Sequence, residues 1–417
     1  MIKRPTLLFL CHTLPYPPDG GVWIRTYNIL RLLARVYDIT LLCFERTLAG
    51  GPASSEVIAA SADALRQLAR VEVFPLPYVR SRRRLLTDHL RSTVSARVFT
   101  RYLYESPSFR TRLRDLVRSR AFDLVHVDSL DLSGYLHEVS SLPVICVHHN
   151  VESQLLQRRA NAEKTAILRA YIGYQALLMR REERAWCPRA DLNVTVSEQD
   201  SDNLLTIAPR ARIAVVPNGV DTTFFKPRGP GREGVAFVGS NTWFANRDAL
   251  AYFAEQILPL IRAEVPSVPV YWVGAATEED RRRYQDQFGI TMTGYADDVR
   301  DYIANALCYV VPLRVGGGTR LKILDAWSMG KAIVSTSVGS EGLDTVPEVN
   351  ILVADTAQAF ADSVLRVLKN PDLRQRLGAG GRATVERTYS WDVIGESMNE
   401  LYRGVARSGG AIAVGSP

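Results

Sequence analysis

The chain has 417 residues, of which 47% are hydrophobic and 23% charged, and it carries a net charge of +7 at neutral pH. This length predicts two domains, and this composition excludes a wholly disordered chain. No run approaches the roughly 18–20 apolar residues that cross a bilayer, so we expect no membrane span. The five cysteines are scattered along the chain, mostly in apolar runs, and they are Cys11, Cys43, Cys146, Cys187 and Cys308. Their odd number and their spacing predict reduced thiols in the core of a cytoplasmic protein.

Apolar runs of strand length alternate with helical patterns in the first half of the chain. The runs predict strands at 7–11, 39–44, 123–127, 143–147, 192–196 and 213–216, with a helix at 22–35. We interpret 7–11 as a first strand rather than part of a signal peptide, because His12 and a Pro/Gly-rich loop follow it without a cleavage site. Two helical segments, 80–120 and 151–185, interrupt the alternation.

The basic charge is concentrated in the segment 80–120. It contains twelve arginines, no lysine and three acids, so its net positive charge exceeds that of the whole chain. The concentration predicts a patch facing an anionic partner such as membrane phospholipid, a lipid-phosphate acceptor or nucleic acid. A solvated helical face is the alternative interpretation.

The composition changes at 226–233, where proline and glycine predict a linker. The alternation then restarts, with strands at 235–238, 270–273, 290–293, 307–311 and 332–335 and with helices at 248–263, 319–329, 356–368, 371–386 and 391–405. The predicted domains are therefore 1–225, which includes the Arg-rich helical insert, and 234–387, followed by a C-terminal helix and tail at 388–417. The tail from 409 onward is expected to fray.

Strands that alternate with helices in both halves predict two α/β domains, each a Rossmann-like, doubly wound parallel sheet. Ligands bind such sheets beyond the carboxyl ends of the strands. If the two domains face each other, the ligand lies in a central cleft between them.

The most informative stretch is 311–331. Gly316, Gly317 and Gly318 follow an apolar strand and precede a helix with Thr319 as the expected N-cap. Glycines let the backbone approach a ligand and aim free N–H groups at it. Arg320 and Lys322, in the first helical turn, oppose the helix dipole at a cost of about 0.3–1 kcal/mol each when exposed, which a bound diphosphate would offset.

Asp325 lies three residues after Lys322, roughly on the same side of that helix. This spacing predicts a phosphate contact together with a carboxylate for ribose hydroxyls. A glycine turn before an ordinary helix with solvated cations is the alternative.

The stretch, continued to Gly342, resembles the donor-binding signature of the family-4 retaining glycosyltransferases, in a subgroup with a Gly-Gly-Gly-Thr-Arg-Leu-Lys loop. Further matching segments occur in the expected order at 15–21, 148–152, 216–221, 237–240 and 293–299. The resemblance covers nearly the whole chain except the Arg-rich insert. It implies the two-domain GT-B architecture, with the last helix, near Trp391, packing back on the first domain.

The resemblance also implies site residues. The implied donor-binding residues are Gly20, Gly21, Gly239, Ser240, Asn246, Arg247, Gly294, Tyr295, Gly316, Gly317, Gly318, Thr319, Arg320 and Glu341. The implied catalytic residues are His149, Lys322 and Asp325, and the implied acceptor-side residues are His148, Asn150 and Glu152. His148 and His149 end an apolar strand, where functional side chains often lie, although a structural histidine is the alternative. His126 is expected to be a core or edge histidine.

Two features depart from the family pattern. The family usually carries two glutamates eight positions apart around the loop, and here these positions are Gly317 and Asp325. The Arg and Lys that many relatives place after the first strand of the second domain are also absent, so Arg247, Arg320 and Lys322 are candidate substitutes.

The implied activity is retaining transfer of a hexose-type sugar from a UDP- or GDP-sugar to a glycan or lipid-linked acceptor. Cations and N–H groups would stabilise the departing diphosphate. We expect no metal, no other cofactor and no nucleic acid partner, and a peripheral position at the inner membrane face through the Arg-rich segment. The alternatives are a sugar-nucleotide epimerase or phosphorylase on the same architecture, a non-catalytic binding protein, and a nucleic-acid-binding role.

Two weaker patterns have structural interpretations. Ser197 to Asp200 predicts a helix N-cap rather than part of a metal-binding carboxylate pair with Asp202. The glycine cluster 378–381 imitates a dinucleotide loop, but no strand precedes it, so a break between two helices is expected.

Overall fold

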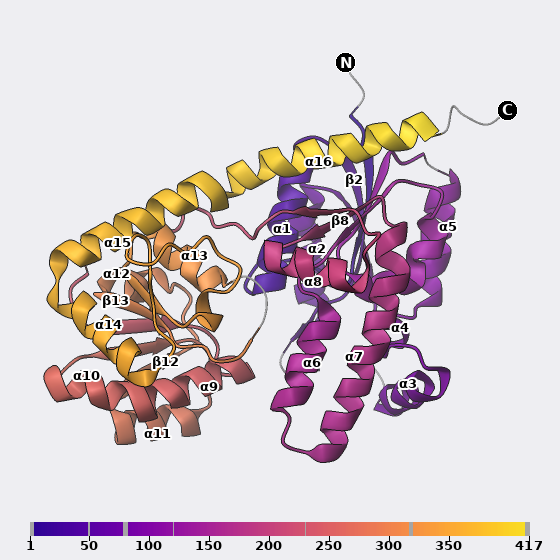
Figure 1. The fold of residues 1–417 in the computed structure, drawn as a ribbon. Coiled ribbons are helices and arrows are strands. Elements are labelled where there is room, and N and C mark those ends of the chain that lie inside the picture. The colour runs from indigo at the N-terminus through magenta and orange to yellow at the C-terminus, as the bar shows by residue number, and fades with distance from the viewer. Residues whose placement is uncertain are drawn as a thin grey trace. The chain divides into compact units, whose positions relative to one another are not determined.

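The structure is a computed structural model and describes residues 4–48, 51–77, 82–119, 121–229, 231–316 and 320–412 (Figure 1). The chain divides into two compact units, Met1–Val216 with Gly395–Pro417, and Pro217–Ile394. The segment 226–233 falls within the second unit.

The first unit is built on a seven-stranded parallel sheet, as the alternating pattern predicts. The strand order β5-β2-β1-β6-β7-β8-β9 places β1 and β6 near the centre. Their side chains are buried throughout, because helices cover both faces of the sheet (Figure 1). The strands are β1 (Thr6–Cys11), β2 (Asp38–Phe44), β5 (Arg70–Phe74), β6 (Leu124–Val127), β7 (Val144–Val147), β8 (Leu192–Thr195) and β9 (Ile213–Val215).

The helices of the first unit connect these strands, and a short antiparallel pair, β3 (Thr47–Leu48) and β4 (Gly51–Pro52), follows β2. The helices are α1 (Gly21–Leu33), α2 (Ser55–Arg66), α3 (Arg82–Ser95), α4 (Thr100–Leu103), α5 (Pro107–Ser119), the 3-10 helix η1 (Leu130–Val139), α6 (Glu152–Ala162), α7 (Ala166–Trp186), the 3-10 turn η2 (Cys187–Arg189) and α8 (Glu198–Ile207).

The second unit repeats the architecture with six parallel strands in the order β12-β11-β10-β13-β14-β15. They are β10 (Val235–Val238), β11 (Val270–Val273), β12 (Ile290–Gly294), β13 (Cys308–Val311), β14 (Ile333–Ser335) and β15 (Leu352–Val353). The helical elements are α9 (Phe244–Tyr252), the π-helical turn η3 (Phe253–Ile257), α10 (Leu258–Glu264), α11 (Glu278–Phe288), α12 (Arg300–Asn305), α13 (Leu321–Ser328), the 3-10 turn η4 (Val338–Ser340), α14 (Ala357–Lys369), α15 (Pro371–Thr384) and the π-helical turn η5 (Val385–Tyr389).

The last helix, α16 (Trp391–Ile412), begins in the second unit, and from Gly395 onward it belongs to the first. There its Tyr402 hydroxyl lies 2.7 Å from His126 Nδ1 of β6. The helix continues to Ile412, so the expectation that the chain frays from residue 409 is wrong for 409–412.

Two predicted helical segments are divided. The segment 80–120 forms α3, α4 and α5, and 151–185 forms α6 and α7. Between α6 and α7 the backbone is extended at Glu163 and Thr165, and the Glu163 carboxylate accepts the Thr165 N–H at 2.9 Å. A local side-chain bond of this kind competes with the helical hydrogen bond and ends the helix.

The glycine cluster 378–381 does not break a helix, which corrects the sequence-based prediction. It lies inside α15, where glycines permit close packing against neighbouring backbone and rings. A Cβ at Gly378 would lie 2.2 Å from Gly330 O, and one at Gly381 would lie 2.2 Å from the Trp327 ring. Glycine makes a helix less stable than alanine does, but a larger residue would not fit at these positions.

Two other predictions, the N-cap at Ser197 and the buried free cysteines, are confirmed. Ser197 Oγ accepts the Asp200 N–H at 3.1 Å and caps α8. All five cysteines are free and buried. No described helix is both long enough and apolar enough to cross a membrane.

Candidate functional site

The residues that end the parallel strands gather at one edge of each sheet. Because such edges carry the ligand sites of α/β folds, the functional side chains are sought there. In the second unit this edge is formed by the segments after β10, β11, β12, β13 and β14, and in the first unit by those after β1, β6 and β7.

Glycines bring the backbone of the second unit close together at this edge. Gly239 follows β10, and Gly274 follows β11 at φ 141°. A Cβ at Gly274 would lie 2.5 Å from Gly239 O, so only glycine fits. Gly274 N donates to Gly294 O at 3.1 Å, which ties the end of β12 to the same edge.

Lys322, in the first turn of α13, reaches this edge. Its Nζ donates to Asn246 Oδ1 at 3.0 Å and lies 3.9 Å from the centre of the Phe237 ring. A Cβ at Gly239 would lie 2.8 Å from Nζ, so the absence of a side chain there leaves room beside the ammonium group. No carboxylate of the described chain pairs with Lys322. Burial and the nearby Arg320 guanidinium therefore hold its pKa well below the usual value.

Arg320 lies directly before α13 and is 4% exposed. Its Nε and Nη2 donate to Val338 O at 3.3 and 3.1 Å, and Nη2 lies 3.8 Å from the Glu341 carboxylate. Gly316 adopts φ 139°, and a Cβ there would lie 3.0 Å from Arg320 Nη2. The structure thus brings Gly316, Arg320 and Glu341 together. Gly317, Gly318 and Thr319, the centre of the predicted loop, lie outside the described residues.

Asp325 lies one helical turn after Lys322 on α13 and is half-buried. Burial raises its pKa to about 7. Among the described residues no donor bonds its carboxylate, so Asp325 is an acceptor that a ligand could use.

The segment after Gly239 has polar side chains held in place. Asn246 is buried and donates to Ser240 O at 2.7 Å while its Oδ1 accepts from Lys322. Ser240 Oγ lies 2.7 Å from Thr242 Oγ1. Arg247 is exposed and donates to Thr242 O at 3.0 Å, so it does not join Lys322. Tyr295 is 76% exposed, directly after β12, which leaves its ring available for stacking.

In the first unit, α1 begins at Gly21, directly after the Pro/Gly-rich loop. Arg46 fixes this loop: it donates to Pro17 O at 2.6 Å, pairs with Asp19 and lies 3.6 Å above the Trp23 ring. A Cβ at Gly20 would lie 2.6 Å from that ring. The backbone N–H groups of the first turn of α1 are therefore presented by a loop of defined shape.

Asp128, directly after β6, is fully buried and lies at the centre of a cluster that the sequence analysis missed. Its Oδ2 lies 2.8 Å from Thr26 Oγ1, 3.2 Å from His149 Nε2 and 3.6 Å from His12 Nδ1. Its Oδ1 lies 3.3 Å from His126 Nε2. Burial alone would raise the pKa of Asp128, but the surrounding histidines hold it well below its usual value.

The pKa values of His12 and His126, two histidines of the cluster, are shifted in opposite directions. Burial lowers the pKa of His12, but Asp128 more than offsets this effect and raises it. The pKa of His126 is lowered by burial, and its ring stacks on Phe9 at 3.7 Å between centroids. His126 is thus a core histidine, as expected, whereas His12 and His149 lie at the strand ends.

Cys11, His12 and Asp128 also place potential metal-ligand atoms within 4.8 Å of one another. However, the Cys11 thiol donates to Thr13 O at 2.8 Å, and burial raises its pKa well above the usual value. A thiol that stays protonated is a poor ligand, since metals bind the thiolate. The geometry here fits hydrogen bonding to the Asp128 carboxylate.

His148 turns into the core. Its Nε2 lies 2.9 Å from Asn193 Oδ1 of β8, and burial lowers its pKa to about 4. It is therefore separated from the Asp128 cluster, although it neighbours His149 in the sequence. Glu152 begins α6 and receives a 3.4 Å bond from Asn150 Nδ2. Burial and the nearby Asp131 raise the pKa of Glu152.

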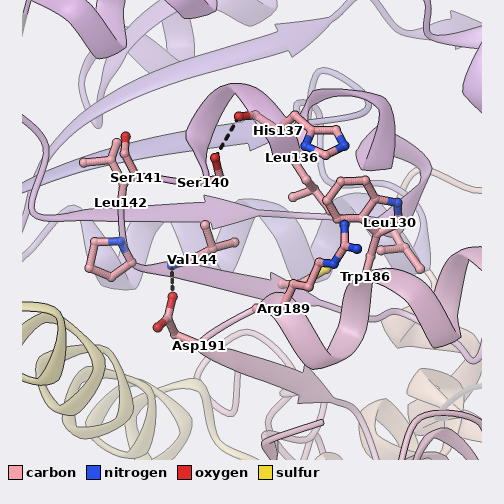
Figure 2. Close-up of a pocket in the computed structure, with 13 residues that line it drawn as sticks. Leu130, Leu136, His137, Ser140, Ser141, Leu142, Val144, Trp186, Arg189 and Asp191 are labelled. Atoms are coloured by element: carbon pink, nitrogen blue, oxygen red, sulfur yellow. Dashed lines mark hydrogen bonds between the residues drawn. The ribbon is translucent and has the colours of Figure 1, made fainter. Parts of the chain in front are cut away.

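A pocket of about 360 Å³ in the first unit lies elsewhere (Figure 2). It is lined by residues at the amino ends of β7 and β8, where Asp191 accepts the Val144 N–H at 2.8 Å. Arg189 and His137 lie against the Trp186 ring at its other end (Figure 2). None of the predicted site residues that the structure describes lines this pocket.

The Arg-rich segment is less available to an anionic partner than its composition predicts. Within it, Arg84 and Arg91 pair with Asp88, and Arg91 also pairs with Glu105. Acids outside the segment neutralise more of its charge: Glu72 pairs with Arg112, Glu138 with Arg110 and Arg114, and Glu182 with Arg97 and Arg101.

The sequence reasoning missed Asp128, His12, Arg46 and Asn241. Asp128 and His12 directly follow β6 and β1, so the strand-end rule could have found them. Asn241 is 3% exposed and donates to Asp280, and its Oδ1 has no hydrogen-bond partner in the described structure. Arg46 had no local signal, because its partners lie 27 and 29 residues away.

Comparisons with known proteins agree with this geometry. A family model described as Glycosyltransferase Family 4 matches residues 19–224, and one described as Glycosyl transferases group 1 matches residues 232–370. The chain is 27% identical over 260 residues to alpha-maltose-1-phosphate synthase of Mycolicibacterium smegmatis, covering 54% of this chain and 66% of that protein. It is 27% identical over 215 residues to phosphatidyl-myo-inositol mannosyltransferase of Mycobacterium tuberculosis, covering 48% of this chain and 56% of that protein. The matched regions thus span less than two thirds of these relatives.

Solved structures share the fold over nearly the whole chain. Sucrose-phosphate synthase from Thermosynechococcus elongatus superimposes with a TM-score of 0.67 at 18% identity, covering 97% of this chain and 100% of that one. Anabaena HepE in complex with UDP-glucose gives a TM-score of 0.65 at 13% identity, covering 95% and 99%. The chain therefore belongs to the glycosyltransferases of the family-4 type and has the GT-B fold.

Proposed function

We propose that this protein transfers a hexose-type sugar from a UDP- or GDP-sugar to a glycan or lipid-linked acceptor, with retention of anomeric configuration. The observation that carries the proposal is Lys322, a desolvated lysine without a carboxylate partner beside the glycine-lined edge of the second unit. A buried ammonium group without a counter-charge is costly, and a diphosphate would supply that charge.

The donor is assigned to the second unit. Lys322 and the backbone at Gly239 bind the diphosphate, and Arg320 adds charge beside Gly316. Asp325 accepts hydroxyl donors of the nucleoside or sugar, and Tyr295 stacks on the base. As the bond to the sugar breaks, negative charge grows on the diphosphate, and these fixed cations stabilise it without a protein rearrangement.

The acceptor is assigned to the first unit. His149 is oriented by Asp128, and Glu152 and Asn150 hydrogen-bond acceptor hydroxyls. The loop Gly-Gly-Gly-Thr-Arg-Leu-Lys marks the proposed subgroup, and the proposal needs no metal or further cofactor. Relatives named for maltose 1-phosphate and for phosphatidyl-myo-inositol support phosphorylated or lipid acceptors as the first ones to test.

The test is calorimetric titration of the protein with UDP, GDP and ADP, repeated on Lys322→Ala and Asp325→Ala. Saturable binding of one nucleotide, weakened about tenfold or more by Lys322→Ala, is expected because a hydrogen bond to a charged group contributes about 1.5–3 kcal/mol. Arg376→Ala is the matched control, since Arg376 is exposed on α15, a helix that carries none of the proposed donor-binding residues. A folded protein that binds none of the three nucleotides would refute the donor assignment.

Membrane association is the second part of the proposal, and the surface that supports it is one face of α3. Leu86, Leu90 and Val94 recur at helical spacing and are 71%, 64% and 79% exposed. Arg83 precedes them on the same face, is exposed, and has no ion-pair partner in the described chain. An apolar stripe with a cation at its end fits an anionic lipid surface at the inner membrane face.

Sedimentation with vesicles tests this part independently of nucleotide binding. We expect the protein to bind vesicles that contain phosphatidylglycerol more than pure phosphatidylcholine vesicles, and Leu86→Ser with Leu90→Ser to abolish the binding. Leu205→Ser is the control, because Leu205 is exposed on α8 and not on α3. Equal binding by the double variant would refute the assignment of α3, whatever the nucleotide result.

A further inference from the structure

A second cavity, in the second unit, lies at the edge of the sheet opposite to the donor residues. Its volume is about 600 Å³. Leu307, before β13, and Lys331 and Ala332, before β14, place it at the amino ends of these strands. One face of α15 and the glycines Gly229 and Gly231 form the rest of its wall.

The charged groups that line this cavity are all cationic. They are Lys331, Arg374 and Arg382, and none of the described lining residues is acidic. Arg382 Nε pairs with Glu386 at 2.7 Å, which neutralises one of the three charges. The lining of the cavity therefore keeps a positive charge.

Each cation also bonds carbonyl groups at the end of a helix. Lys331 Nζ donates to Ala304 O of α12 at 2.8 Å. Arg374 Nη1 donates to Val367 O and Leu368 O of α14 at 2.8 and 2.9 Å. Arg382 Nη1 donates to Ser328 O of α13 at 2.6 Å.

These bonds leave donors unused. Each helix end carries only about half a negative charge, so the three carbonyl ends do not balance the cations. For Arg374, no bond of Nε or Nη2 is found in the described chain, and for Lys331 only one of three ammonium hydrogens is bonded. The remaining donors are available to a ligand.

Lys331 gives the strongest indication of an anionic ligand. It is 5% exposed and has no carboxylate partner in the described structure. Burial lowers its pKa to about 8, with a further contribution from Arg374. Burying an ammonium group without a counter-charge is unfavourable, and a bound anion would offset the cost.

The cavity also has room for more than a free ion. Its volume lies within the range of about 300–1,000 Å³ that is typical of small-molecule sites. Gly229, Gly231, Gly330 and Gly378 contribute only backbone to the wall, and Leu307 and Ala332 add apolar surface. The lining therefore combines a cationic end with a neutral wall.

We propose that this cavity binds a phosphate-bearing small molecule, at a site separate from the donor site. Lys331 and Arg374 hold the phosphate, and the glycine and apolar wall contacts the remainder of the ligand. The site is independent of the transferase proposal, because none of its residues belongs to the donor edge.

The probes are glucose 6-phosphate, inorganic phosphate and glucose, titrated calorimetrically into the full chain in excess UDP or GDP and, separately, into Lys322→Ala. Glucose 6-phosphate is expected to bind in both experiments, and glucose in neither. If inorganic phosphate binds as tightly as glucose 6-phosphate, the ligand is the phosphate ion itself. If no phosphate compound binds to the folded protein, the proposal is overturned.

Two variants locate the binding. Gln375→Glu adds a carboxylate to the wall without removing any helix-end bond, and Arg374→Ala removes a donor. Both are expected to weaken binding about tenfold or more, the equivalent of about 1.4 kcal/mol. Arg376→Ala changes the same charge on α15 outside this cavity and should leave binding unchanged. The proposal would be overturned if Gln375→Glu binds glucose 6-phosphate as tightly as the wild type and if the ligand does not change amide hydrogen exchange at 227–231 and 374–382. This holds even if Arg374→Ala fails to fold.

Discussion

Asp128 Oδ2 lies 3.2 Å from His149 Nε2, and the two residues end neighbouring strands of the first sheet. The carboxylate is fully buried, so it is a fixed acceptor that directs the Nε2 proton of His149 inward. The other ring nitrogen, Nδ1, is then left as an acceptor for a ligand. Asp128 is thus a positioning residue for His149.

Asp128→Asn is expected to lower the pKa of His12, because the neutral amide no longer favours the imidazolium. The proton chemical shifts of the His12 ring over a pH titration measure this. Asp115→Asn, an exposed change of the same kind, should leave the pKa of His12 unaltered.

The same variant is expected to unfold more easily. The pKa of Asp128 is depressed in the folded state, so its contribution is present above its unfolded pKa of about 3.9 and is lost as pH falls below that. Urea unfolding at pH 7 should show a loss of about 1–3 kcal/mol that diminishes below pH 4. A difference that stays constant from pH 7 to pH 3 would contradict the assigned charge.

Lys322→Met is expected to change nucleotide affinity and the free energy of unfolding in opposite directions. The pKa of Lys322 is depressed in the folded state, so the folded protein carries a cost below the unfolded lysine pKa of about 10.4. The variant should therefore gain on the order of 1 kcal/mol in unfolding free energy at pH 7 while losing nucleotide affinity. Urea unfolding and calorimetry measure the two effects, and Arg376→Met, at an exposed position on α15, should change neither by much. Loss of stability in Lys322→Met would mean that the lysine is structural.

Asp325→Asn is expected to alter the pH dependence of stability. The pKa of Asp325 is raised to about 7 in the folded state, so ionising it opposes folding increasingly from about pH 4 to pH 7. The variant should gain more stability over the wild type at pH 8 than at pH 4.5. Equal differences at the two pH values in urea unfolding would show that Asp325 is not desolvated.

Gly239→Ala and Gly274→Ala form a matched pair. At Gly239 the new Cβ meets side chains rather than backbone, namely Lys322 Nζ and Asn246 Nδ2 at 2.8 Å and Phe237 Cε1 at 2.9 Å, so nucleotide affinity should fall with a smaller loss of stability than at Gly274. At Gly274 it meets the backbone carbonyl of Gly239 at 2.5 Å with φ 141°, so the protein should lose about 1–3 kcal/mol. Thermal unfolding and calorimetry of both variants test the contrast, and equal stability of the two variants would contradict it.

Much of the fold could be predicted because its signals are local. The apolar run that forms β1 and the glycines at Gly20 and Gly316 can be read from neighbouring residues. Helix boundaries were less predictable where a side chain competes with the backbone, as at Glu163. The cluster at 378–381 was misinterpreted because the glycine requirement comes from Gly330 and Trp327, which are distant in the chain.

The sequence by itself determined the two α/β sheets, the sheet edge at which a ligand site is expected, and the presence of Lys322 and Asp325 on one helix. These follow from periodicity and from the fixed geometry of parallel strands. Only the tertiary structure decided which charges are paired. It joined Asp128 to His149, placed Lys322 beside Asn246 with no carboxylate partner among the described residues, turned His148 into the core and neutralised much of the Arg-rich segment. Such pairing depends on contacts between residues far apart in the chain and on burial, and neither is encoded in local spacing.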